Sequence, residues 1–448
     1  MKKHKIDMCN GAIFSQLVRF TIPLILSGEL QILFNAADTM VVGRFSGSDS
    51  LAAVGSTSSL INLLINLFIG ISIGTDVLVA KAYSTNKKEE MEKIVYTSVI
   101  TGLICGIILI LLGNILAQPL LLLMGTPDDV IGKAVLYMRI YFWCMPGFIV
   151  FNFGSAVLRS SGDSKIPLYY ISLAGVINII LNLIFVIICN MDVAGVGLAS
   201  VISQSLSGCL IVLHLIRNRD ICRLVIKGSH IDKRILANMI RIGLPAGIQS
   251  TLINLSNTLI QSSVNSFGSL TMAGHAAATN IEMFMCRAVN AVSQSALSFT
   301  GQNMGAARYR RVKRIMLESL FLAFIVGETA GIIANIAGRN FLGAFTTDSR
   351  VVDIGMIKLM ILGIPYGLFG FMDVLPMCIR GMGYSVAPML ISLTGVCLFR
   401  VFWINTIFAG MRTLEVLYMS YPVSWIFTTL MQVILFMCIR KKAMPEKQ

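Results

Sequence analysis

Long apolar runs dominate the sequence, and they constrain its fold more than any other feature. A run of about 20 predominantly apolar residues crosses the hydrocarbon core of a bilayer as a helix. Charged residues make up only 13% of the 448 residues, about half of the share in soluble globular proteins, so no segment remains for an ordinary water-facing domain. The sequence therefore predicts an all-α polytopic membrane protein with twelve transmembrane helices. They are expected near residues 13–42, 52–82, 94–117, 133–156, 167–190, 194–216, 237–264, 273–301, 315–337, 353–377, 388–409 and 416–438.

Basic side chains gather in alternate loops. If the amino terminus is cytoplasmic, the inner segments hold 26 of the 36 Lys and Arg residues. Because Lys and Arg are retained on the cytoplasmic side, this predicts a multi-pass protein of the cell membrane with both termini inside. The net charge of +14 then reports topology, and we expect no nucleic-acid partner.

Motifs for covalent or cofactor chemistry are missing from the sequence. It contains no P-loop, no dinucleotide fingerprint and no GxSxG, and its ten cysteines form no CxxC pair. The four histidines show no metal-ligand spacing. We therefore predict no enzyme activity and no cofactor, so the energy for any transport comes from an ion gradient or a partner.

The chain matches itself at an offset close to half its length. Residues 20–24 (FTIPL) resemble 242–246 (IGLPA), and 158–167 (LRSSGDSKIP) resemble 379–388 (IRGMGYSVAP), at offsets of 222 and 221. This predicts a six-helix lobe over 1–216, a cytoplasmic loop over 217–236 and a second six-helix lobe over 237–448. An even number of helices gives a parallel repeat of the kind found in transporters. The alternative is a duplicated channel or a structural bundle.

Carboxylates at membrane depth mark ion pathways, since each costs on the order of 2.5–3.5 kcal/mol to insert. In the first lobe, Asp38 shares a helix face with Gln31 and Asn35, and Asn178 and Asn182 share one face of the fifth helix. Together these oxygens predict a site for Na+ at Asp38, Asn178 and Asn182, or a proton acceptor. Interhelical hydrogen bonding is the other interpretation of the asparagines. The other acids at this depth are Glu29, Asp76, Glu282, Glu328 and Asp373.

The second lobe offers a separate acidic region. His275 and Glu282 follow one face of the eighth helix, and Asp373 lies in the tenth helix, two turns after Tyr366. Arg287, in the helix of Glu282, could instead neutralise either acid as a buried ion pair. Methionine and aromatic residues beside the acids, such as Met283 and Phe369, could form a soft cavity for lipophilic cations, although core packing explains them as well.

Several stretches resemble the multidrug and toxic compound extrusion (MATE) family, in particular its bacterial NorM-like and DinF-like members. The resemblance covers nearly the whole chain and rests on 35–44 (NAADTMVVGR), 51–55 (LAAVG), 159–167, 274–280 (GHAAATN) and 301–306 (GQNMGA). It implies a secondary active multidrug antiporter, which exports organic and mostly cationic amphipathic compounds in exchange for Na+ or H+ by alternating access. It implies small-molecule drugs as cargo and the lipid bilayer as surroundings, and we expect a monomer.

The resemblance also assigns roles to single residues. Asp38 matches the coupling acid of the first helix, and Asn178 begins the fifth-helix pattern Asn-x-x-x-Asp, in which this chain has Asn182 in place of the aspartate. Ser200 stands where the family often has Thr. One carboxylate in this site weakens the expectation for sodium and favours a proton. Asp373 matches the tenth-helix acid of NorM-like members, and Glu282 is expected to replace their seventh-helix acid.

The candidate site residues fall into two groups. Ion coupling is expected at Asp38, Asn178, Asn182, Ser200, Glu282 and Asp373, and the substrate cleft at Gln31, Asn35, His275, Met283, Tyr366 and Phe369. A flippase of lipid-linked precursors is the alternative function. It would line its cleft with cations to bind pyrophosphate, whereas the few intramembrane bases, Arg19, Arg139, Arg287, Lys358 and Arg400, form no stripe.

Overall fold

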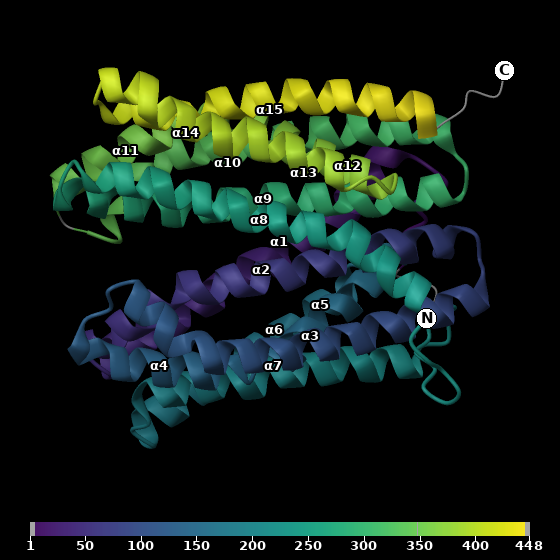
Figure 1. Ribbon diagram of the computed structural model, residues 1–448, viewed down its shortest axis with the longest axis horizontal. Coiled ribbons are helices and arrows are strands. Elements are labelled where there is room, and N and C mark those ends of the chain that lie inside the picture. The colour runs from purple at the N-terminus through teal and green to yellow at the C-terminus, as the bar shows by residue number, and fades with distance from the viewer. Residues whose placement is uncertain (1–4, 347, 444–448) are drawn as a thin grey trace. The chain divides into compact units, whose positions relative to one another are not determined.

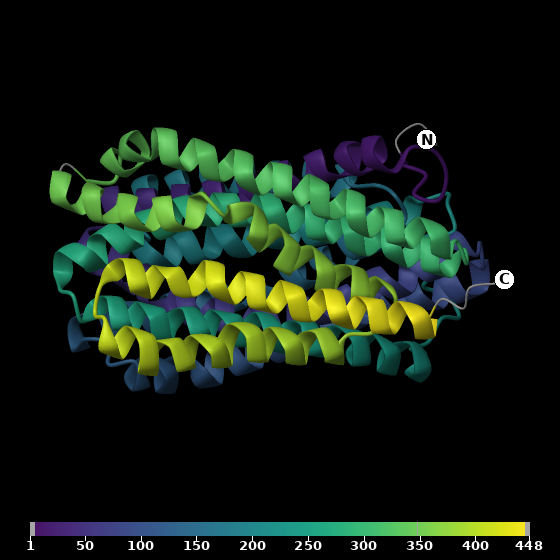
Figure 2. The same ribbon diagram turned by 90° about the horizontal axis from the view of Figure 1, so that it is seen from above.

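The computed structural model describes residues 5–346 and 348–443, and within these residues helices joined by loops form the fold, with no strand. Every predicted span coincides with a helix or with a run of consecutive helices (Figures 1 and 2). The elements of the first half are α1 (Ile13–Phe45), α2 (Ser48–Ser84), α3 (Lys88–Leu123), α4 (Asp128–Phe142), α5 (Met145–Ser160), α6 (Lys165–Leu183), η2 (Ile184–Ile188) and α7 (Asp192–Arg217). Those of the second half are α8 (Lys233–Asn265), α9 (Ser269–Gly305), α10 (Tyr309–Gly343), α11 (Ser349–Gly363), α12 (Tyr366–Gly381), α13 (Val386–Ser392), η3 (Leu393–Leu398), α14 (Phe399–Trp403), η4 (Ile404–Phe408) and α15 (Leu414–Ala443).

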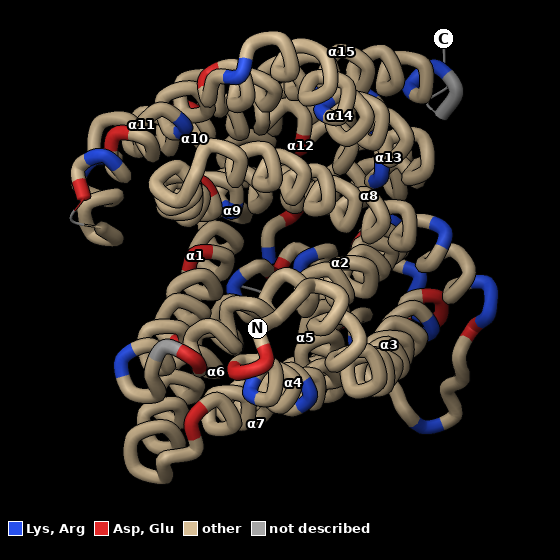
Figure 3. The backbone as a smooth tube through the Cα atoms, turned by 60° about the vertical axis from the view of Figure 1, so that its left-hand side comes forward, with Lys and Arg blue, Asp and Glu red and all other residues tan. Residues whose placement is uncertain are grey.

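The described helices are long and apolar enough for a membrane protein. Eight of them, or up to ten if each bent pair is one span, meet the length and composition of a membrane span. The helices α8 and α9 have 33 and 37 residues, but polar residues such as Asn254 and Asn257 of α8 and Asn280 and Asn290 of α9 lower their hydropathy. Over most of the helical length of each unit, the chain carries neither acidic nor basic side chains (Figure 3).

The internal repeat is visible in the helix boundaries. The helices α2, α3, α4, α5 and α6 begin at residues 48, 88, 128, 145 and 165, and α9 to α13 begin 221 positions later. Both halves bend at the same place, by 45° between α4 and α5 and by 53° between α11 and α12. Gly162 and Gly383, a repeat-related pair in two turns, have φ angles of 94° and 103°, a conformation that favours glycine. The two halves therefore share one local fold.

Two compact units make up the chain, and their limits lie inside helices. Unit 1 comprises Met1–Ile6 and Leu26–Gly247, and unit 2 comprises Asp7–Ile25 and Ile248–Gln448. They differ from the predicted lobes, since the first half of α1 belongs to unit 2 and the connecting loop with the first half of α8 belongs to unit 1.

Packing inside each unit explains these limits. In unit 1, a Cβ on Gly70 of α2 would lie only 2.2 Å from the backbone nitrogen of Gly247, so the two glycines let α8 approach α2 closely. In unit 2, Phe20 of α1 meets Phe299 of α9 edge to face, with 5.7 Å between ring centroids. The first halves of α1 and α8 are each tied to the unit that they pack against.

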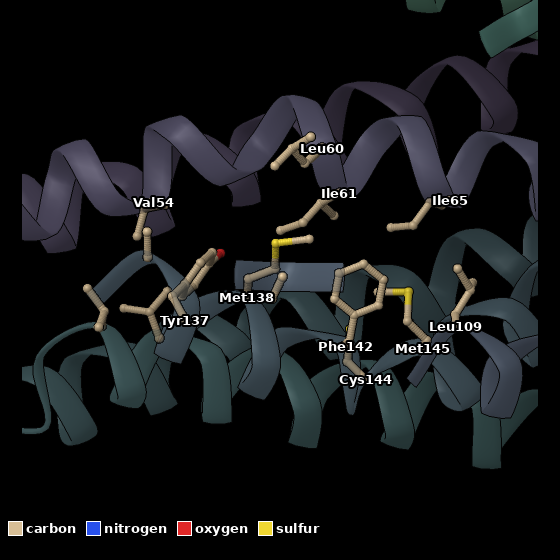
Figure 4. Close-up of a cluster of buried hydrophobic side chains, with 14 of the residues drawn as sticks. Val54, Leu60, Ile61, Ile65, Leu109, Tyr137, Met138, Phe142, Cys144 and Met145 are labelled. Carbon is tan, nitrogen blue, oxygen red and sulfur yellow. The ribbon is translucent and has the colours of Figure 1, made fainter. Parts of the chain in front are cut away.

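The core of unit 1 joins α2 and α3 to the bent pair α4 and α5. Figure 4 shows Ile61 of α2 among Met138, Phe142 and Met145 near this bend. A Cβ on Gly113 of α3 would lie 2.0 Å from the Phe142 ring, so the absence of a side chain there makes room for the ring. Val42 of α1 and Val196 of α7 belong to the same core, so it also holds two of the helices on which the first candidate site is built.

Candidate functional site: buried acids in two units

Asp38 of unit 1 lies beside a pair of amides on α6. Asn178 and Asn182 are 6% and 0% exposed and stand one helical turn apart, so both face the same side. The Asn182 side-chain nitrogen donates to Asp38 Oδ1, and it also lies 3.2 Å from Asn178 Oδ1. Asn178 Nδ2 donates in turn to Ser203 Oγ on α7, at 3.3 Å. The structure thus brings three of the predicted residues into one hydrogen-bonded chain.

The oxygens of this group match the needs of a small cation. Asn182 Oδ1 is buried and has no hydrogen-bond partner among the described residues. A buried acceptor without a partner is costly, and a bound hard cation or a proton on Asp38 would relieve that cost. Carboxylate and amide oxygens are the ligands that hard cations prefer. The residues present therefore fit Na+ and fit protonation of Asp38.

Three further candidates of the first half lie on the helices that carry this group or its partner Ser203. Ser200 is 3% exposed, and its backbone carbonyl, rather than its hydroxyl, contacts Ser203 Oγ at 3.2 Å. The serine of α7 that hydrogen-bonds to Asn178 is therefore Ser203, whereas the sequence predicted Ser200. Its position one turn after Ser200 in an apolar helix is the signal that could have found it. Gln31 is half-buried and Asn35 is exposed on the helix that carries Asp38.

Glu282 of unit 2 carries a basic partner on another helix. Lys358 Nζ of α11 lies 2.8 Å from Glu282 Oε2 and 2.6 Å from Thr279 Oγ1. The Lys358 side chain is 2% exposed and that of Glu282 is 21% exposed. The acid is neutralised by Lys358 and not by Arg287, because packing of α9 on α11, which sequence spacing does not encode, places Lys358 opposite it.

Asp373 of α12 is the second buried acid of unit 2. The Ser293 side chain of α9 hydrogen-bonds to it, while Asp373 Oδ2 has no partner among the described residues. Cys286 lies within electrostatic range of both Asp373 and Glu282, so the two acids share one neighbourhood.

Two of the predicted cleft residues are buried in unit 2. His275 Nδ1 lies 3.0 Å from the Tyr418 hydroxyl and the two rings stack, and Tyr366 is 1% exposed against Trp425. Aromatic partners thus cover both rings, and the place of His275 and Tyr366 in a substrate cleft stays a prediction. Met283 is 44% exposed, and Phe369 is half-buried beside Trp425.

Two further acids have roles in packing. Asp76 of α2 is fully buried, with Arg159 Nη2 at 3.2 Å from Oδ2 and Ser160 Oγ at 2.9 Å from Oδ1. Glu328 Oε1 of α10 accepts from the backbone nitrogen of Gly367 at 3.1 Å, which satisfies a donor in the first turn of α12.

Comparison with known proteins decides the family. A family model described as MatE matches residues 23–184 and 245–404, which covers both halves of the repeat. The chain belongs to the MatE family. The predicted resemblance is thereby confirmed, and with it an all-helical, multi-pass membrane protein of a transporter family.

Individual MatE relatives are distant in sequence. The chain is 28% identical over 392 residues to the "Probable multidrug resistance protein YoeA" of Bacillus subtilis, with 86% of this chain and 85% of that protein covered. It is 22% identical over 389 residues to the "Probable multidrug resistance protein NorM" of Thermotoga maritima, covering 86% and 83%. A crystal structure of MATE in the bent conformation matches with a TM-score of 0.87 at 21% identity, over 98% of this chain and 97% of that one. The twelve-helix fold of the family is thus this chain's fold.

Proposed function

We propose that this MatE-family protein is a secondary active multidrug antiporter, which exports organic and mostly cationic amphipathic compounds in exchange for Na+ or H+ by alternating access. Two relatives named as multidrug resistance proteins support the class of cargo. The protein resides in the plasma membrane with both termini in the cytoplasm, and it works as a monomer without a cofactor.

The observation that carries the proposal is the group of Asp38, Asn178 and Asn182. It combines one carboxylate with a buried amide oxygen that has no partner in the described chain. A cation bound there would pair with the carboxylate and give the amide oxygen a partner. Ion binding that favours one facing of the transporter, and cargo binding that favours the other, couple the two fluxes. Because Lys358 already neutralises Glu282, the coupling role is assigned to Asp38, with Asp373 as a second acid.

Efflux from everted vesicles tests this role. Ethidium transport is measured under an imposed Na+ gradient and, separately, under an imposed pH gradient, for wild type, Asp38→Asn and Asp373→Asn. The control is Asp353→Asn, which removes an exposed ion pair with Arg339 by the same chemical change. We expect one of the two gradients to drive transport in wild type and in the control, and to fail in Asp38→Asn. Undiminished gradient-driven efflux in both Asp38→Asn and Asp373→Asn would overturn the assignment.

A further inference from the structure

The interior of unit 2 is rich in buried cations. Lys358 and Arg400 are 1% and 3% exposed and lie within predicted spans, and Arg380 is 2% exposed and follows the predicted span 353–377 at the end of α12. Lys and Arg side chains are normally exposed, because burying an unpaired charge in a membrane interior costs free energy. These three cations therefore require an explanation that the coupling role of Asp38 does not supply.

Two of the three lie close to the same acid. Lys358 forms the ion pair with Glu282, and Arg400 of α14 lies within electrostatic range of the same carboxylate. Arg400 Nη1 donates to Asn257 Oδ1 of α8 at 2.7 Å, and its guanidinium stands 4.1 Å from the centre of the Tyr421 ring. We call Glu282, Lys358, Arg400, Asn257 and Tyr421 the cationic cluster. It contains two bases and one acid, and Asp373 lies in the same neighbourhood as Glu282.

One hydrogen-bond donor of the cationic cluster has no partner in the described chain. Arg400 Nε is buried and has no hydrogen-bond partner among the described residues. A guanidinium presents its donors in a planar fork that matches a carboxylate, and such charge-assisted bonds are about twice as strong as neutral ones. Asn257 is exposed and Glu282 is partly exposed, so a ligand reaches the cluster from the side of these two residues.

These charges are specific to unit 2. At the repeat offset of 221, Glu282 and Lys358 correspond to Ile61 and Tyr137, which are apolar and aromatic members of the unit 1 core. Asp38 accepts a hydrogen bond from the Asn182 amide and forms no ion pair with a basic side chain of the described residues. The Asp38 site of unit 1 thus holds an acid without a basic partner, whereas Glu282 of unit 2 is paired with a base.

We propose that the cationic cluster binds the carboxylate of an amphipathic zwitterion or anion, with Lys358 and Arg400 as its ligands and Glu282 as the resident counter-ion that the cargo displaces. The inference rests on the proposed efflux function and narrows its cargo, since a compound with a carboxylate gains contacts that a simple organic cation lacks. Glu282 then competes with such cargo for the two bases, so removal of the Glu282 charge should tighten binding of the cargo.

Equilibrium binding to the purified full-length protein, without any gradient, tests this site. The probes are norfloxacin, which carries a carboxylate, and norfloxacin ethyl ester, which keeps the amine and lacks the carboxylate. We expect Arg400→Gln and Lys358→Gln to weaken norfloxacin binding about tenfold, the scale of one charge-assisted hydrogen bond, with little change for the ester. The control is Arg287→Gln, which alters a basic residue of α9 outside the cluster.

Glu282→Gln is expected to change norfloxacin affinity in the opposite direction, and it tests the proposal even if Arg400→Gln does not fold. Removal of the competing carboxylate is expected to tighten norfloxacin binding several-fold, whereas ester binding stays equal or weakens. Retained ester binding shows that a variant is folded. Weaker norfloxacin binding in Glu282→Gln, or equal losses for both probes in Arg400→Gln, overturns the proposal. Failure of gradient-driven efflux in wild type would remove the proposed function and leave these binding results intact.

Discussion

Arg159 of α5 forms an ion pair with Asp76 of α2, with Arg159 Nη2 3.2 Å from Asp76 Oδ2. The same repeat position in unit 2 is Arg380, but the counterpart of Asp76 there is Leu297. Arg380 donates instead to the side-chain oxygen of Gln249, at 2.6 Å. The two halves share helix boundaries and bends, and they have diverged in the charges that they bury.

The ion pair of Asp76 and Arg159 is expected to stabilise unit 1. Asp76 is fully buried, so Arg159→Met takes its cationic partner away and is expected to cost about 3–5 kcal/mol of unfolding free energy. Titration of the purified protein with sodium dodecyl sulfate measures the loss. Glu90→Gln, which breaks an exposed pair with Lys87, is the control and is expected to cost under about 1 kcal/mol. The double variant Asp76→Leu with Arg159→Met is expected to recover part of the loss, and equal stability of Arg159→Met and wild type would contradict the account.

Sequence alone predicted the fold well and the partners of the charges poorly. Apolar run length and basic loops predicted twelve segments that each coincide with a helix or a run of helices, and the pattern shared by 158–167 and 379–388 predicted the repeat. Asn178 and Asn182 were found because one helix turn joins them. Lys358 and Glu282 were not paired, since 76 positions separate them in the sequence and only the rotation of α9 against α11 makes them meet. The unit limits inside α8 and α1 depend in the same way on contacts between distant residues, Gly70 with Gly247 and Phe20 with Phe299.

The loop after α7 is expected to loosen in acid. Burial raises the pKa of Asp220, but hydrogen bonds from Lys5 and Tyr83 and the Lys5 charge outweigh it, so the pKa lies below its usual 3.8. A carboxylate with a lowered pKa stabilises the fold above pH 3.8, and that stability is lost as the pH falls through the lowered value. Hydrogen exchange of residues 218–232, corrected for the intrinsic rate, is expected to rise below about pH 3.8 in wild type.

Asp220→Asn is the matched variant for this prediction. It removes the titrating group, so exchange of the same loop is expected to be faster than wild type at pH 6 and to change little with further acidification. A wild-type acid response that persists in Asp220→Asn would show that other groups hold the loop.

A second carboxylate in the Asp38 site is expected to raise its sodium affinity. Asn182→Asp places a carboxylate where the amide now contacts Asp38, and it restores the family pattern Asn-x-x-x-Asp. One charge-assisted contact corresponds to about a tenfold gain in binding, so half-maximal sodium stimulation of ethidium efflux should occur at about tenfold lower sodium. Asn182→Gln keeps the amide and is the control. An unchanged sodium dependence in Asn182→Asp would argue against Asn182 as part of the ion site.

If cargo moves against an ion that binds at Asp38, the reverse must hold as well, because coupling between two binding sites is reciprocal. Purified protein is reconstituted in liposomes that contain tetraphenylphosphonium, and the outward drug gradient is used to drive the ion inward while internal pH and radioactive sodium are followed. We predict that either protons or sodium ions enter with wild-type protein as the drug leaves, and that Asp38→Asn abolishes this entry while Asp353→Asn preserves it. Drug-driven ion entry of equal size in Asp38→Asn and wild type would contradict the account.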